Sequence, residues 1–203
     1  MFPKIDSLIR TIDANLIVES RKKVLNPLID YIQKKVSNKE DIRLNFICTH
    51  NSRRSHLSQV WAQTMAHYFQ INQVYCYSGG TEATALYPKV AKTLEQMGFQ
   101  ILTLSNDKNP VYSIKFSKNE HPIIGFSKIY DDVFNPSSHF AAIMTCSQAD
   151  AGCPFIAGAE KRIPITYEDP KDSDNTSSQT EVYSNRSFQI ATEMLYVFSQ
   201  LKK

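Results

Sequence analysis

The sequence predicts an α/β domain built around a mostly parallel sheet. Short apolar runs typical of buried strands, at 43–47, 74–77, 140–145 and 162–165, alternate along the chain with segments typical of helices. This alternation is the pattern of parallel strands joined by right-handed helical crossovers. The chain has 203 residues, of which 42% are hydrophobic, so we expect one main domain with a well-buried core.

Residues 1–40 are expected to form an N-terminal helical extension of an α/β domain at 41–203. Apolar residues recur at helical spacing between residues 5 and 12. A second helix is expected over 27–36, with Pro27 tolerated in its first turn. The extension either packs on the main domain or serves as a protein-binding arm, and the sequence leaves both open.

The other elements follow from local patterns. Apolar and polar residues alternate on both sides of the turn-like segment 118–122, which predicts a β-hairpin inserted at about 110–131. Gly98 stands where a left-handed residue would end a helix. The remaining expected elements are helices at 57–69, 88–97 and 180–201, hairpin strands at 111–117 and 123–130, and a polar loop at 171–179.

Composition narrows the class of protein. The net charge of +3 suits an anionic substrate, and no stripe of lysine and arginine with interleaved aromatic residues indicates nucleic-acid binding. No apolar run approaches the roughly 20 residues that span a bilayer, and the first residues do not resemble a signal peptide. Four cysteines without export are expected to be reduced thiols. We therefore expect a cytoplasmic protein without membrane or nucleic-acid partners.

The most informative motif is the segment 48–55, Cys-Thr-His-Asn-Ser-Arg-Arg-Ser, between an expected strand and an expected helix. In such a loop the amides and the helix N-terminus face a bound anion, and an arginine fork holds two of its oxygens. The same positive field favours a nucleophilic thiolate. The motif predicts chemistry on phosphate or a similar oxyanion, bound by Thr49, His50, Asn51, Ser52, Arg53 and Arg54. Alternatively, Cys48 is a buried strand-end residue and both arginines are solvated charges.

A pair of cysteines, Cys146 and Cys153, follows the expected strand at 140–145. In a reducing compartment such a pair is either redox-active or half of a metal site. A zinc site needs about four ligands, and the histidines are scattered without ligand spacing, so we expect no metal. Small residues around Gly152 would allow the movement that disulfide exchange needs. The alternative is two small buried hydrophobic residues.

Asp169 is the third candidate. The following residue, Pro170, restricts it to an extended conformation on a loop. A carboxylic acid that faces the oxyanion loop could protonate a leaving oxygen. Taken alone, Asp169 would be interpreted as an ordinary turn residue.

Together these segments resemble the low-molecular-weight protein tyrosine phosphatase superfamily, and more closely its thioredoxin-coupled arsenate reductases. They occur in the family's order and span residues 43 to about 200. The resemblance implies a four-stranded parallel sheet flanked by helices, to which the helical extension and the hairpin are additions. The matching segments are 46–55, 77–82 with Pro88, 146–150 with Cys153 and Pro154, and 168–170.

The resemblance implies a role for each site residue. Cys48 would be the nucleophile and Arg54 the oxyanion clamp. Ser55 would hydrogen-bond the Cys48 thiolate, Asn51 would hold the shape of the loop, and Asp169 would be the general acid. No cofactor is implied.

In the reductase, the resemblance further implies a relay of three thiols. Cys48 would attack arsenate with loss of water, and Cys146 would then attack the Cys48 sulfur, releasing arsenite. Cys153 would take over the disulfide from Cys146. Thioredoxin, or a similar thiol reductant, would reduce the exposed pair.

The chain departs from the family's pattern at three positions. His50 occupies a loop position where the family usually has glycine, which alters the loop or adds a titrating group near the anion. Arg53 stands where a second loop cysteine is common, so no disulfide can form within the loop, and it adds positive charge beside the anion. Gln59 replaces a glutamate common in the reductases, which puts their cation site in doubt.

Three functions remain compatible with the sequence. Reduction of arsenate to arsenite is favoured by the cysteines at 146 and 153. A protein tyrosine phosphatase that hydrolyses aryl phosphate monoesters through a phosphocysteine would need only Cys48, Arg54 and Asp169. A non-enzymatic oxyanion sensor or interaction module would use the added helices, and the complete nucleophile set argues against it. The physiological substrate, the electron donor, the oligomeric state and the roles of the added helices and hairpin stay open.

Overall fold

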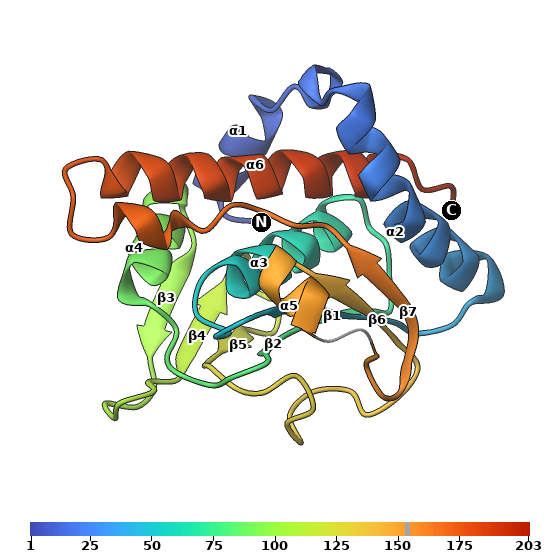
Figure 1. The fold of residues 1–203 in the computed structure, drawn as a ribbon. Helices are drawn as coiled ribbons and strands as arrows, with labels where there is room; N and C mark the ends of the chain where they lie inside the picture. The colour runs from blue at the N-terminus through green and yellow to red at the C-terminus, as the bar shows by residue number, and fades with distance from the viewer. Residues whose placement is uncertain (153–154) are drawn as a thin grey trace.

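The predicted four-stranded parallel sheet is present in the structure, a computed structural model that describes residues 1–152 and 155–203 (Figure 1). The strand order is β2-β1-β6-β7, and each neighbouring pair runs parallel. β1 and β6 are the central strands, so their carboxyl ends meet at one edge of the sheet. The strands are β1 Ile42–Cys48, β2 Val74–Gly80, β6 Phe140–Met144 and β7 Ala159–Pro164.

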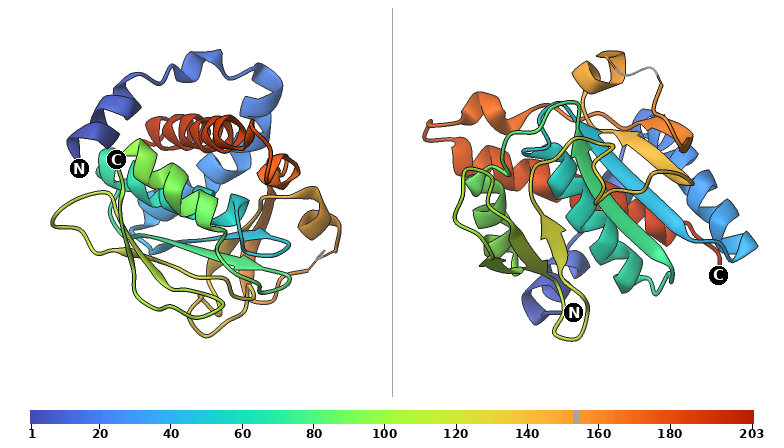
Figure 2. Two further views of the ribbon diagram at one scale, coloured as in Figure 1. Left: turned by 90° about the vertical axis from the view of Figure 1, so that its left-hand side faces the viewer. Right: turned by 90° about the horizontal axis from the view of Figure 1, so that it is seen from below.

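Alternate side chains of the central strands enter two clusters, one on each face of the sheet. Leu44, Phe46 and Ile143 belong to the larger cluster, whereas Ile47 and Met144 belong to a smaller one. This separation follows from the two-residue repeat of a strand, and β6 is apolar throughout because both of its faces are covered. Coil between β5 and β6 crosses the face that carries the smaller cluster (Figure 2, right).

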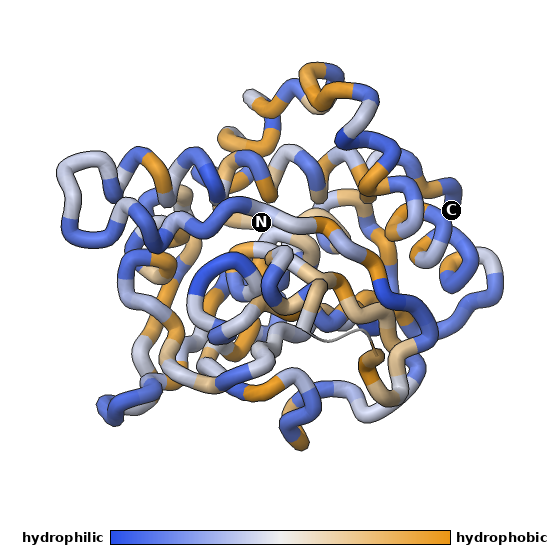
Figure 3. Tube along the Cα trace, in the orientation of Figure 1, coloured by the Kyte–Doolittle hydropathy of each residue, from blue (hydrophilic) through white to orange (hydrophobic). Residues whose placement is uncertain are grey.

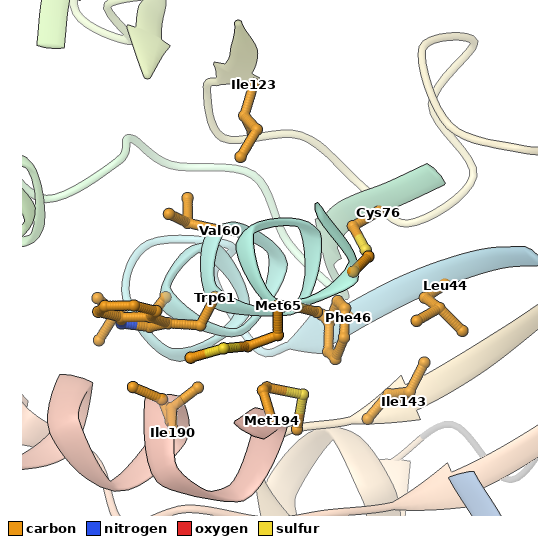
Figure 4. Packing of buried hydrophobic residues seen from close by; sticks show 14 of the residues in the cluster. Leu44, Phe46, Val60, Trp61, Met65, Cys76, Ile123, Ile143, Ile190 and Met194 are labelled. Carbon is orange, nitrogen blue, oxygen red and sulfur yellow. The ribbon is translucent and has the colours of Figure 1, made fainter. Parts of the chain in front are cut away.

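The larger cluster includes Trp61 of α3, which lies beside Ile190 of the C-terminal helix (Figure 4). Its indole is fully buried, and its N–H donates to Ser187 Oγ at 2.9 Å. Phe99 meets the indole edge to face, with 5.1 Å between the ring centroids. Met65 and Met194 fill the space between the two helices, so α3 is fixed firmly against α6 (Figure 4).

Most helices lie where the sequence predicts them. α4 Pro88–Met97 ends at Gly98, whose φ of 107° is left-handed as expected for that cap. α3 Arg54–Tyr68 and α6 Gln179–Ser199 match two further predictions. The segment expected as a loop begins with the 3-10 turn η2 Pro170–Ser173, and the short helix α5 Ser147–Gly152 is an addition. Among the described residues, no helix is both long and apolar enough to cross a membrane.

The N-terminal segment forms an arch over α6 (Figures 1 and 2). It consists of α1 Pro3–Arg10, the 3-10 turn η1 Ala14–Leu16 and α2 Glu19–Asn38. The expected helix start at Pro27 is wrong, because α2 begins at Glu19 and Pro27 lies inside it. An interior proline costs a helix about 3 kcal/mol, and burial of flanking residues such as Leu25 and Leu28 offsets that cost.

Buried residues of α1 and α2 join the same core as the sheet, so the extension packs on the main domain. The turn between these helices is hydrophobic in part (Figure 3), and Leu16 and Val18 are exposed. The division of the chain at residue 40 into an extension and a domain stays a prediction.

The predicted hairpin is part of a three-stranded antiparallel sheet. β4 Tyr112–Lys115 pairs with β5 Ile123–Gly125 as expected, and β3 Gln100–Thr103 adds to the other edge of β4. The expected second hairpin strand at 123–130 is too long, because pairing stops at Gly125. The residues beyond it turn towards the parallel sheet, where Gly80 and Ile129 form an isolated bridge.

Two glutamines of α3 complete the hydrogen bonding along the outer edge of β2. Gln59 Nε2 donates to the Cys76 carbonyl at 3.0 Å, and Gln63 Nε2 donates to the Val74 carbonyl at 3.0 Å. The Cys76 amide donates in turn to Gln63 Oε1 at 3.0 Å. Gln59 is therefore held by β2 main chain.

Candidate active site

The segment between β1 and α3 forms a loop whose carbonyl groups point outward. Five consecutive carbonyl oxygens accept hydrogen bonds from groups around the loop. The carbonyl of Cys48 accepts from Thr81 N (3.1 Å), that of Thr49 from Glu82 N (2.8 Å), and that of His50 from Ser127 Oγ (2.9 Å). The carbonyl of Asn51 accepts from His56 Nε2 (2.9 Å), and that of Ser52 from Tyr87 N (3.0 Å).

The amides of the same peptide units point inward. In a trans peptide the N–H lies opposite to the C=O, so anchoring five carbonyls outside turns the N–H groups of residues 49–53 towards the centre of the loop. Asn51 has a left-handed φ of 44°, which helps successive amides converge into an anion-binding nest. α3 begins at Arg54, so the helix N-terminus adds its positive end to the nest.

Gly80 allows β2 to approach this loop closely. A Cβ atom there would lie 2.7 Å from both the Asn51 nitrogen and the Thr49 oxygen, and 2.3 Å from the Glu82 oxygen. Only a residue without a side chain fits against the main chain at these distances, which explains the glycine in the predicted motif.

Cys48 lies at the start of the loop with its sulfur directed at Ser55. The Sγ–Oγ distance is 3.1 Å, and Asn51 Nδ2 donates to the same Ser55 oxygen at 2.9 Å. Because the serine oxygen accepts from Asn51, its own proton is free to donate to the cysteine thiolate. This geometry suits the roles that the resemblance implied for Ser55 and Asn51.

His56 supports the loop from below, and the sequence analysis did not single it out. Its Nε2 lies 2.9 Å from the Asn51 carbonyl and its Nδ1 lies 3.2 Å from Ser78 Oγ. Burial lowers the pKa of His56 to about 3, so the ring is neutral. The Asn51 carbonyl can only accept, so the proton of the neutral ring is on Nε2. Nδ1 then accepts a hydrogen bond from the Ser78 hydroxyl. The sequence feature that could have identified His56 is its position directly after the motif at 48–55.

The structure brings together Arg54 and Asp169, two residues far apart in the sequence. Arg54 Nη1 donates to the Tyr167 carbonyl at 3.0 Å, and Nη2 pairs with Asp169 Oδ2. The guanidinium is buried, and its Nε has no partner among the described residues. The residues expected to serve as oxyanion clamp and general acid thus lie side by side at the loop.

Arg53 turns away from the loop centre. Its Nε donates to Tyr183 Oη at 2.6 Å, its Nη2 pairs with Asp174 at 2.5 Å, and the guanidinium lies 4.2 Å from the Tyr87 ring centroid. Asp174 balances its charge, so the side chain ties the loop to α6. His50 lies at the rim, 3.6 Å from Glu82.

Cys146 lies at the carboxyl end of β6, beside the loop. Its sulfur is buried, lies 3.4 Å from Thr49 Oγ1 and accepts from the Ala149 amide at 3.3 Å. Cys48 and Cys146 belong to the same small buried cluster. Cys153 lies outside the described residues.

Within the described residues, no group of three histidine, cysteine, aspartate or glutamate side chains could hold a metal ion. Gln59, whose position raised the question of a cation, is bonded to β2, although its Oε1 has no partner there. A hollow of about 530 Å³ opens beside the loop, lined by residues that include Arg53, Tyr87, Lys108 and Lys171.

Comparison with known proteins identifies relatives by sequence. No family model matches the chain. The arsenate reductase of Staphylococcus aureus (strain Newman) is 26% identical over 126 residues, which cover 62% of this chain and 76% of the relative. Arsenate reductase 2 of Staphylococcus haemolyticus (strain JCSC1435) is 26% identical over 125 residues, with the same coverage.

Solved structures share the fold. The low-molecular-weight phosphotyrosine phosphatase of Vibrio cholerae O395 superposes with a TM-score of 0.51 at 14% identity, covering 78% of this chain and 95% of its own. An arsenate reductase in a phosphate-binding state gives 0.50 at 17% identity, covering 79% and 99%.

The sheet and the cysteine loop at its edge define an α/β protein whose loop has the geometry expected for an oxyanion site. More particularly, the chain is similar in sequence to arsenate reductases and shares the fold of low-molecular-weight phosphotyrosine phosphatase and arsenate reductase structures.

Proposed function

We propose that the protein reduces arsenate to arsenite with electrons from a thiol. The observation that carries this proposal is the place of Cys146, 3.4 Å from the hydroxyl of Thr49, the residue that follows Cys48. Hydrolysis of a phosphate ester does not need a second thiol, whereas reduction does. The curated relatives are named arsenate reductases, which supports the same conclusion.

The first step uses the loop and the pair of Arg54 and Asp169. Arsenate would bind to the inward amides and take the Arg54 fork, which releases Asp169 towards a leaving oxygen. The Cys48 thiolate then attacks arsenic as a bond from arsenic to a hydroxyl oxygen breaks, and that hydroxyl takes a proton from Asp169 and leaves as water. Ser55 stabilises the thiolate before attack.

The second step transfers two electrons to arsenic. The Cys146 thiolate attacks Cys48 Sγ, the sulfur–arsenic bond breaks with its electron pair on arsenic, and arsenite departs. A disulfide then joins Cys48 and Cys146. The Cys153 thiolate would then attack the Cys146 sulfur, which frees Cys48 and leaves a Cys146–Cys153 disulfide. Thioredoxin or a similar dithiol would reduce that disulfide. A cytoplasmic location, where such reductants act, is part of this proposal.

Thioredoxin-coupled oxidation of NADPH in the presence of arsenate tests the relay. We expect turnover in the wild type and its loss in Cys48→Ser, Cys146→Ser and Cys153→Ser. Cys76→Ser is the matched control, because Cys76 is buried and burial raises the pKa of its thiol. Turnover that survived Cys146→Ser would refute the relay.

A second candidate, hydrolysis of aryl phosphate monoesters, is favoured by the hollow beside the loop. Its volume of about 530 Å³ exceeds what arsenate needs, and Tyr87 offers a ring on which an aryl group could stack. Such hydrolysis would depend on Cys48 and survive Cys146→Ser. Cleavage of an aryl phosphate without any turnover of arsenate would make the phosphatase the main function.

A further inference from the structure

A buried carboxylate connects the N-terminal extension to the main domain. Glu193, in the C-terminal half of α6, is 3% exposed and accepts two hydrogen bonds from Arg21 of α2, from Nε at 2.9 Å and Nη2 at 2.8 Å. The contact lies where α2 starts beside α6 (Figure 1). A planar fork on a carboxylate restricts both side chains, so the pair fixes α2 relative to α6.

The Glu193 carboxylate also binds Tyr167, whose carbonyl accepts a hydrogen bond from Arg54. Tyr167 Oη donates to Glu193 Oε2 at 2.8 Å, and the Arg21 guanidinium carbon lies 4.9 Å from the centroid of the Tyr167 ring. The carbonyl of Tyr167 accepts from Arg54 Nη1 at 3.0 Å. An unbroken series of contacts therefore runs from the first turn of α2 to the arginine of the oxyanion loop.

Arg54 depends on this series for its orientation. Its neutral partner is the Tyr167 carbonyl, and its charged partner, Asp169, stands two residues further along the same segment. When an anion replaces Asp169 at the guanidinium, the Tyr167 carbonyl is what still orients the fork. A shift of Tyr167 would displace clamp and acid together.

We propose that Arg21 is a positioning residue for Arg54, acting through Glu193 and Tyr167, so that the N-terminal extension takes part in oxyanion binding. This proposal rests on the proposed function only in that Arg54 clamps the anion. It holds for arsenate and for phosphate esters alike.

Calorimetric titration of the full chain with inorganic phosphate tests the proposal, because phosphate has the shape of arsenate and is not reduced. We expect Arg21→Met to weaken phosphate binding about tenfold and to lower kcat/KM for arsenate by a similar factor. Arg21→Lys should recover part of both, since it restores the charge without the fork. Lys22→Met is the matched control, because Lys22 pairs with the exposed Glu19 on the same helix and lies 5.9 Å from the Tyr196 ring centroid, outside the series that leads to Arg54.

A double-mutant cycle separates positioning from general stability. Tyr167→Phe removes the hydroxyl but leaves the Arg21–Glu193 pair, and Arg21→Met should add little to it in phosphate affinity. If the Arg21→Met chain does not fold, Arg21→Lys and Tyr167→Phe carry the test, and each should weaken phosphate binding.

Two results would overturn the proposal: phosphate affinity within twofold of wild type in the Arg21 variants, or fully additive effects in the cycle. A wild-type chain that bound neither phosphate nor arsenate would instead remove the proposed function, and this proposal with it.

Discussion

Lys128 lies buried behind the oxyanion loop, and replacing it should stabilise the protein. The side chain is 2% exposed, its Nζ donates to the Phe126 carbonyl at 3.3 Å, and it lies over the rings of Phe126 and Phe134 at 4.3 and 5.2 Å. Burial lowers its pKa from 10.5 to about 8, although Asp132 opposes the shift. One pKa unit is worth about 1.4 kcal/mol, so the buried charge costs the native state about 3 kcal/mol at neutral pH.

Lys128→Met keeps the unbranched stem and removes the ammonium. The loss of cation–π attraction offsets part of the gain, so we expect the free energy of unfolding to rise by about 1 to 3 kcal/mol at pH 7. Between pH 8 and 10.5 the unfolded chain holds more protons at this residue than the native state does. The wild type therefore gains stability as pH rises through that window, and the advantage of the variant shrinks.

Urea denaturation of both proteins at pH 7 and at pH 9.5 measures the difference. A variant less stable than wild type at pH 7, or a difference that does not change with pH, would refute the reasoning. The Lys128 main-chain amide donates to Asn51 Oδ1 at 2.9 Å in either protein. Weaker phosphate binding by the variant would therefore report the loss of the charge.

Three further predictions concern the loop and the core. Gly80→Ala should push the loop away from β2, so we expect phosphate binding to be lost by titration and stability to fall by about 2 kcal/mol; unchanged binding would contradict the close approach. Ser55→Ala should remove a hydrogen bond to the Cys48 thiolate, so alkylation by iodoacetamide at pH 7 should slow by about tenfold; an equal rate would show that the serine does not act on the sulfur. Trp61→Phe should lower the free energy of unfolding by about 1 to 3 kcal/mol through the lost hydrogen bond to Ser187 Oγ and the lost ring volume; a denaturation midpoint equal to that of wild type would argue against this packing.

Local sequence was enough to predict the strand, loop and helix that carry Cys48. The loop amides and the helix N-terminus are formed by consecutive residues, so the motif at 48–55 was enough to predict their arrangement. The direction of Arg53 was not predictable in this way. Its partners, Asp174 and Tyr183, are more than a hundred positions away, and spacing within the loop contains no information about them.

The sequence-based predictions of the fold that were wrong or incomplete failed because tertiary contacts decide those elements. α2 runs through Pro27 because the surrounding apolar residues are buried against α6 and the sheet, which outweighs local helix propensity. β3 was missed because its four residues are largely exposed and its pairing with β4 depends on a distant segment. No sequence pattern distinguishes His56 and Lys128 from other polar residues. Their roles follow from their burial behind the loop.

The two glutamines on β2 affect how folded copies of the chain meet one another. An outer strand with free amides and carbonyls is a template on which a strand of another molecule can add, and this is a common route to aggregation. Gln59 and Gln63 occupy the main-chain groups of Val74 and Cys76. An incoming strand would have to displace three hydrogen bonds from a rigid helix, so this edge resists intermolecular pairing for as long as α3 stays folded.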